Sequence, residues 1–86
     1  MIYMDISKEE EVKDFIREWF MSQFGIELED SPQILDNYLY LEFESGNGGT
    51  KKYRLYFTSR TDFLNLSRSD MKLWILEFIF QMTMGV

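Results

Sequence analysis

The apolar residues of this 86-residue chain change their spacing twice, and this change limits the fold more than any other feature. From Val12 to Phe24 they recur every three or four residues, the period of one helix face. From Leu39 to Phe57 they alternate with polar residues, as in a strand with one buried face. From residue 71 onwards the helical period returns. This order predicts an α+β domain, in which an N-terminal and a C-terminal helix pack on one face of a small antiparallel sheet.

The first helix is predicted at residues 7–24. Ser7 and Glu10 have the spacing of a capping box, and Gly25 supplies a C-terminal stop. Residues 1–6 alternate between apolar and polar side chains, so an additional edge strand is expected there.

The second helix is predicted at about residues 68–84. Ser67 is suited to cap its N-terminus, and Asp70 places a negative charge in its first turn. The preceding stretch, residues 58–66, is the candidate for a third short strand.

A β-hairpin is predicted around the glycine-rich segment 45–50, because the runs on either side both alternate. Two registers keep the apolar residues on one face. One pairs Phe43 with Tyr53; the other, shifted by two residues, pairs Glu42 with Lys52 and Tyr38 with Tyr56. Both registers leave a polar, tyrosine-rich outer face.

The composition excludes most familiar active sites. The chain has no cysteine and no histidine, which removes thiolate nucleophiles, zinc-thiolate sites and the commonest acid-base residue. Glu42 and Glu44 share a strand face, but Lys52 and Arg54 are placed to neutralise them across the hairpin. We therefore expect no enzyme, no catalytic residue, no cofactor and no metal site.

The length and the apolar pattern indicate one domain over residues 1–86. The N-terminus lacks the features of a secretory signal, and no apolar run approaches the roughly 20 residues that span a bilayer. The expectation is a cytoplasmic protein without a membrane partner.

Charge is divided unevenly along the chain. Residues 1–44 contain twelve acidic and three basic residues, a net charge of −9, whereas residues 45–86 have a net charge of +3. This balance disfavours direct nucleic-acid binding. The candidate acidic face consists of Glu9, Glu10, Asp14, Glu18, Glu27, Glu29 and Asp30.

The acidic face has two interpretations. It is either a solvated surface, or a partner-binding array that occupies a cationic groove and excludes nucleic acid from it. Small inhibitors from phages and other mobile elements act in the second way as a class, and this analogy rests on no shared motif. A second candidate surface is the sheet face with Tyr38, Tyr40 and Tyr56, because tyrosine is enriched at interfaces.

The C-terminal helix has apolar residues on two sides. Met71, Trp74, Ile75, Phe78, Ile79 and Met82 form one stripe, and the other contains Leu73, Leu76, Phe80 and Met84. Either the fold covers both stripes, or the second one binds another molecule, most simply a second copy. The favoured hypothesis is an inhibitor or adaptor that binds a basic protein surface; the alternative is a homodimeric module joined through the second stripe.

Overall fold

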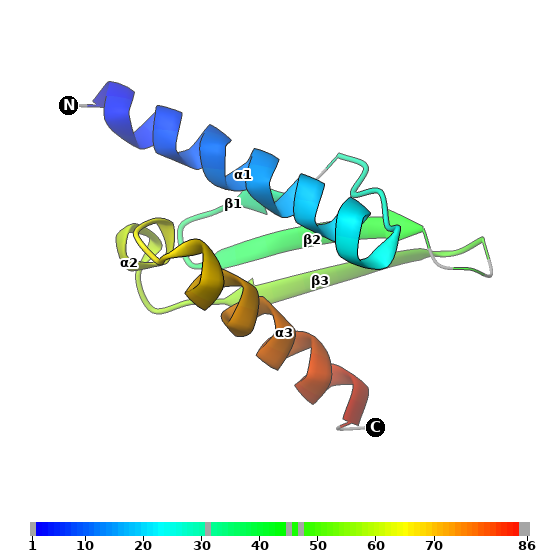
Figure 1. Ribbon diagram of the computed structural model, residues 1–86. Coiled ribbons are helices and arrows are strands. Elements are labelled where there is room, and N and C mark those ends of the chain that lie inside the picture. The colour runs from blue at the N-terminus through cyan, green and yellow to red at the C-terminus, as the bar shows by residue number, and fades with distance from the viewer. Residues whose placement is uncertain (1, 31, 45, 47, 85–86) are drawn as a thin grey trace.

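The computed structural model describes residues 2–30, 32–44, 46 and 48–84 of the chain, and side chains between residues 8 and 79. The elements follow in the order α1 (Ile2–Phe24), β1 (Gln33–Ile34), β2 (Tyr38–Glu44), β3 (Thr50–Tyr56), α2 (Arg60–Leu64) and α3 (Arg68–Met84). The three strands form one antiparallel sheet in the order β1-β2-β3, and both long helices cross the same face of it (Figure 1). The predicted α+β fold is confirmed.

Helix α1 begins five residues before the predicted start. Residues 2–6 are helical, so the edge strand expected there and the capping box at Ser7 are both wrong. Extending an existing helix adds one hydrogen bond for each residue that is fixed, whereas a new strand needs an edge to pair with. A short alternating run next to a strong helix therefore joins the helix.

The predicted stop of α1 is confirmed. Gly25 has a φ of +66°, in the left-handed region that glycine adopts without a steric penalty. Its N–H donates to the carbonyl of Met21 at 3.0 Å, and the N–H of Ile26 donates to that of Phe20 at 3.3 Å. These bonds satisfy carbonyl groups in the last turn, and the chain then leaves the helix.

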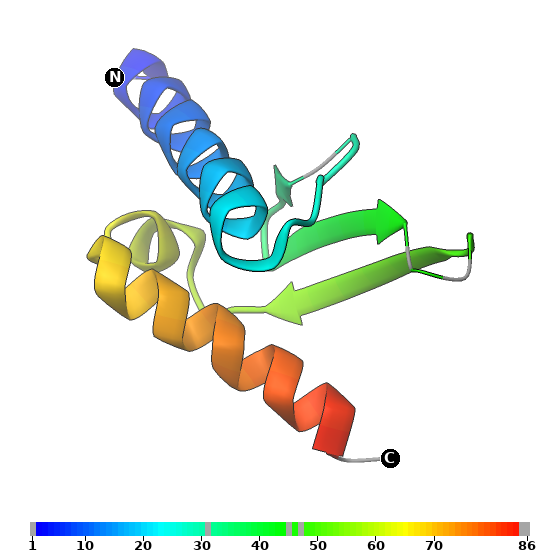
Figure 2. The same ribbon diagram turned by 45° about the vertical axis from the view of Figure 1, so that its right-hand side comes forward.

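The hairpin adopts the second of the two predicted registers, in which Glu42 is the partner of Lys52 and Tyr38 is the partner of Tyr56. The odd-numbered residues point to the helices: Leu39, Leu41 and Leu55 are fully buried. The even-numbered residues form the opposite face, which the two long helices leave uncovered (Figure 2).

The third strand is not where the sequence suggested. It is β1, Gln33–Ile34, within a segment expected to be a loop, whereas the helix α2 forms inside residues 58–66. Ser59 caps α2 by accepting a hydrogen bond from the N–H of Asp62 at 3.2 Å. Adjacent residues Phe63 and Leu64 are both buried, which a strand covered on one face would not permit.

Helix α3 matches its predicted bounds. The Ser67 hydroxyl accepts a hydrogen bond from the N–H of Asp70 at 3.1 Å, as expected of the N-cap. Its inner stripe faces the core, with Met71 and Ile75 fully buried. The whole buried core comprises Val12, Ile16, Trp19, Phe20, Leu28, Ile34, Leu39, Leu41, Leu55, Phe63, Leu64, Met71 and Ile75.

Candidate protein-binding surfaces

The acidic face is divided in the structure between exposed and engaged carboxylates. Glu10 and Asp14 are exposed on α1, and each pairs with a cation of the same helix: Lys13 lies 3.3 Å from Glu10, and Arg17 lies 2.7 Å from Asp14. Glu18 is also exposed. Three carboxylates of the set therefore point to solvent from consecutive turns of one helix.

Glu9 lies apart from these three, because it is turned towards the body of the protein. Its carboxylate pairs with Arg60, at the start of α2, and lies 4.0 Å from Lys13. Only about a quarter of each side chain is exposed, 25% for Glu9 and 23% for Arg60. This pair connects α1 to α2, and sequence patterns alone gave no sign of it because the two residues are 51 positions apart.

The remaining acidic residues, Glu27, Glu29 and Asp30, are exposed in the segment between α1 and β1. The backbone N–H of Glu29 donates to the carbonyl of Glu42 at 3.3 Å, so this segment runs beside β2. The exposed acidic side chains thus extend from α1 to one edge of the sheet.

The outer sheet face brings the three predicted tyrosines together. The rings of Tyr38 and Tyr56 are 5.2 Å apart, and the guanidinium of Arg54 lies 5.8 Å from the centre of the Tyr38 ring. Tyr40 donates a hydrogen bond of 2.7 Å to the carboxylate of Glu42. This bond is the main reason why the pKa of Tyr40 is raised, since it stabilises the protonated phenol; partial burial and the nearby charge of Glu42 act in the same direction.

The tyrosine face is therefore supported by contacts within the chain. Tyr56 is 53% exposed, and together with Tyr40, Lys52 and Arg54 it lines an open hollow of about 450 Å³. Cross-strand aromatic pairs stabilise hairpins without a partner, so these contacts account for the tyrosines structurally.

The two described side chains of the predicted outer stripe of α3 differ in exposure. Leu73 is 60% exposed, whereas Leu76 is half-buried and packs against the core. Phe80 and Met84 belong to the last turns of α3, but their side chains fall outside the described part of the structure. The fold thus covers part of this stripe and leaves Leu73 open.

Leu73 lines a groove between the two long helices. We call this hollow of about 480 Å³ the α1–α3 groove; it is lined by Trp19, Gln23, Phe24, Ser69, Lys72, Leu73 and Leu76. Phe24 is 42% exposed, although it continues the apolar spacing of α1. Its position in the last turn, directly before the stop at Gly25, is the one sequence signal that could have placed it at the rim.

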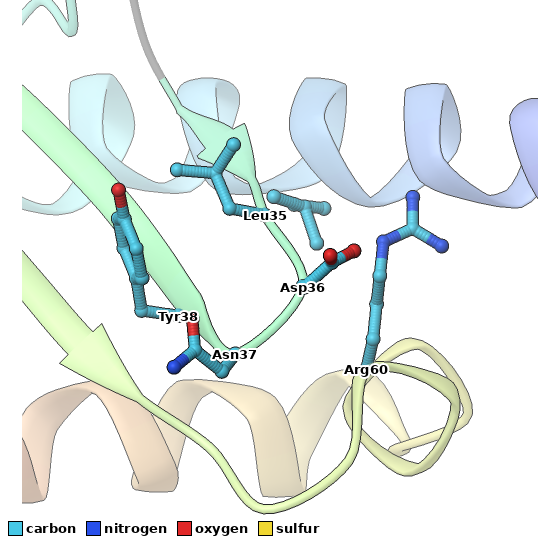
Figure 3. Close-up of a pocket in the computed structure, with 6 residues that line it drawn as sticks. Leu35, Asp36, Asn37, Tyr38 and Arg60 are labelled. Carbon is cyan, nitrogen blue, oxygen red and sulfur yellow. The ribbon is translucent and has the colours of Figure 1, made fainter.

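A separate hollow of about 520 Å³ lies between the start of β2 and α2. It is lined by Ile34, Leu35, Asp36, Asn37, Tyr38 and Arg60. Figure 3 shows the Arg60 side chain rising towards α1, with the carboxylate of Asp36 turned towards it. The guanidinium already pairs with Glu9, so this polar hollow does not present an unengaged cation to a ligand.

The described residues, 2–30, 32–44, 46 and 48–84, contain no group of three or more histidine, cysteine, aspartate or glutamate residues placed to hold a metal ion. Nor do they include a helix that is long and apolar enough to cross a membrane. Comparison of the chain with protein-family models, curated protein sequences and solved structures found no match.

Proposed function

We propose that this chain is a small, non-catalytic cytoplasmic protein that binds a basic surface of another protein, as an inhibitor or an adaptor. The observation that supports this most strongly is the mixture of exposed apolar and acidic side chains around the end of α1. Met21 and Phe24 are 49% and 42% exposed, and they lie between the exposed carboxylates of Glu18 and Glu27. Large apolar side chains with a charged rim are typical of protein interfaces.

The charge distribution favours a basic partner. The chain has a net charge of −6, which attracts cationic surfaces over distances of about a Debye length, roughly 8 Å at physiological ionic strength. Glu10, Asp14 and Glu18 are spaced four residues apart, so α1 holds their backbones at intervals of about 6 Å along its axis. A rigid array of this kind can occupy a cationic groove that otherwise holds nucleic acid.

The intrahelical ion pairs of this array do not prevent partner binding. Lys13 with Glu10 and Arg17 with Asp14 are pairs at the surface, and such pairs contribute only about 0.2–1 kcal/mol each. A partner that offers arginine or lysine in a less solvated setting can replace them at small cost. Glu18 adds an exposed carboxylate on the same helix.

Charge reversal tests this proposal. The substitutions Glu10→Lys, Asp14→Lys and Glu18→Lys together should weaken binding of a lysine-rich test peptide, and the loss should be largest at low salt. The control carries the same change of net charge at three other exposed positions: Asp36→Lys, Glu44→Lys and Asp62→Lys. Calorimetric titration of both variants separates a defined face from the effect of total charge. Equal weakening in the two variants would contradict the proposal.

A second candidate function is supported by Leu73. An exposed leucine beside the half-buried Leu76 is suited to self-association through α3. In that case light scattering should give a concentration-dependent mass near twice 10.4 kDa, and Leu73→Glu should abolish it. A constant mass near 10.4 kDa across the concentration range would contradict homodimer formation.

A further inference from the structure

We propose that the α1–α3 groove receives a basic amphipathic helix of the partner protein. This inference rests on the proposed function and specifies the chemistry of the partner. It depends on three features: an apolar floor exposed between two helices, carboxylates on both rims, and one lysine, Lys72, among the residues that line the groove.

The walls of the groove come from two elements that are distant in sequence. Figures 1 and 2 show the second half of α1 beside the first half of α3, with both helices on the same side of the sheet. Phe24 from one helix and Leu73 from the other both remain partly exposed in the hollow between them. Two adjacent helices form a groove between them, and the side-chain ridge of a third helix can pack into it at an interaxial distance of about 8–10 Å.

The contacts between the helices show which side of α1 faces α3. Glu11 lies 4.0 Å from Arg68, and the ring of Phe15 lies under the guanidinium of Arg68 at 5.1 Å. Glu18 follows Glu11 and Phe15 on the same stripe, seven and three residues further along. Its exposed carboxylate therefore stands at the α1 rim of the groove.

The α3 rim is acidic as well. Asp70, Leu73 and Glu77 follow one another at three and four residues, and all three are exposed. Lys72 lines the groove, but its ammonium lies 5.7 Å and 6.0 Å from the ring centres of Phe15 and Trp19. The ammonium keeps its charge over these rings, but the exposed carboxylates of Glu18, Asp70 and Glu77 outnumber it, so the charge around the groove is negative on balance.

These charges favour a basic helix over a second copy of the chain. Two copies that meet at this groove would each have a net charge of −6 and would bring like carboxylates together. A helix with leucine-type residues on one side and lysine or arginine on the other would cover Phe24 and Leu73 and face the carboxylates of both rims. In this mode of binding, the partner helix contacts the groove through apolar side chains at its positions i, i+3, i+4 and i+7.

The test uses a synthetic helical peptide of about 18 residues that contains only leucine and lysine, with leucine at the anchor spacing. A matched peptide has glutamate in place of each lysine. Calorimetry with the full chain should show binding of the lysine peptide and none of the glutamate peptide. Leu73→Ser should raise Kd about tenfold, because more than half of this side chain is available for burial. Glu77→Gln should raise Kd about threefold and reduce its dependence on salt.

The control variant is Thr61→Ala. Thr61 is exposed on α2 and does not line the groove, so its replacement should leave the affinity unchanged. Circular dichroism should show that all three variants remain folded, because each replaced side chain is exposed.

The remaining outcomes overturn the inference in distinguishable ways. If the peptide binds but Leu73→Ser has no effect, while reversal at Glu10, Asp14 and Glu18 weakens binding, the groove is not the site and the proposed function stands. If neither this peptide nor a lysine-rich one binds, both proposals fail. If the unliganded chain is a dimer that Leu73→Ser converts to a monomer, a second copy occupies the groove.

Discussion

The ion pair between Glu9 and Arg60 should contribute more to the free energy of unfolding than an exposed ion pair does. It joins α1 to the short helix α2, and both partners are about three-quarters buried. We consider the substitutions Glu9→Gln and Arg60→Met, each of which removes a charge and retains most of the side-chain volume. Either one leaves the opposite charge partly buried without this partner.

The size of the effect follows from burial. Exposed ion pairs contribute about 0.2–1 kcal/mol, and removing one partner of a fully buried pair costs about 3–5 kcal/mol. At 25% and 23% exposure the pair lies between these limits, and Lys13 at 4.0 Å partly compensates Glu9 when Arg60 is lost. We therefore expect each single substitution to cost about 1–2 kcal/mol, with a coupling energy of about 1 kcal/mol between them.

The assay is urea unfolding, followed by circular dichroism, for the parent chain, both single variants and the double variant. With a slope of about 1 kcal/mol per M for a domain of this size, each single substitution should lower the midpoint by about 1–2 M. The control cycle is Asp14→Asn with Arg17→Gln, a pair with a well-formed contact of 2.7 Å but exposed fractions of 67% and 42%. A coupling energy for the control pair equal to or above that of Glu9 and Arg60 would refute the argument from burial.

Three further predictions concern single elements. Ser67→Ala should destabilise the chain by about 1 kcal/mol through loss of the α3 cap, and Ser69→Ala, an exposed position inside the helix, should not; equal losses in thermal unfolding would argue against the cap. Leu41→Ala should cost about 2–5 kcal/mol in urea unfolding because Leu41 is fully buried, and a loss below 1 kcal/mol would show a looser core. Ultraviolet titration should show that the pKa of Tyr40 is above its ordinary value of about 10 and that Glu42→Gln lowers it. The raised pKa in the folded state gives a stabilisation that is complete below pH about 10 and is lost as the pH rises beyond it. Above pH about 10 the free energy of unfolding should therefore fall faster in the parent chain than in Glu42→Gln, and an equal decline in both would contradict this contact.

Long elements with a clear period were predictable from the sequence. Helix α3 and the hairpin strands appear where the spacing of apolar residues placed them. The register was narrowed to two alternatives, because parity alone cannot separate pairings that differ by two residues. The choice depends on where the turn closes, and the glycine-rich segment offers more than one such place.

Short elements were not predictable, because tertiary contacts decide them. Strand β1 has only two residues, and Ile34 forms it by pairing with Leu39. Helix α2 has five residues, a length at which periodicity carries no signal; the Ser59 cap and the burial of Phe63 and Leu64 determine it.

The residue types in the candidate surfaces were predictable from the sequence, but their arrangement in space was not. Exposure of Glu10, Asp14 and Glu18 follows from the helix period. The inward turn of Glu9 depends on Arg60, which only the fold brings near. The outer stripe of α3 is apolar by its sequence, yet the groove exists because α1 ends beside it, and no local pattern specifies that placement.

We place the binding site for a basic partner in the α1–α3 groove, between its acidic rims. Backbone NMR of the isotope-labelled chain, titrated with the leucine–lysine peptide, tests this placement. We expect the largest shift changes at Phe24, Leu73 and Leu76, with little change at Tyr40 and Tyr56 on the opposite sheet face. The largest changes on the tyrosine face, or none at the groove when the peptide is saturating, would contradict it.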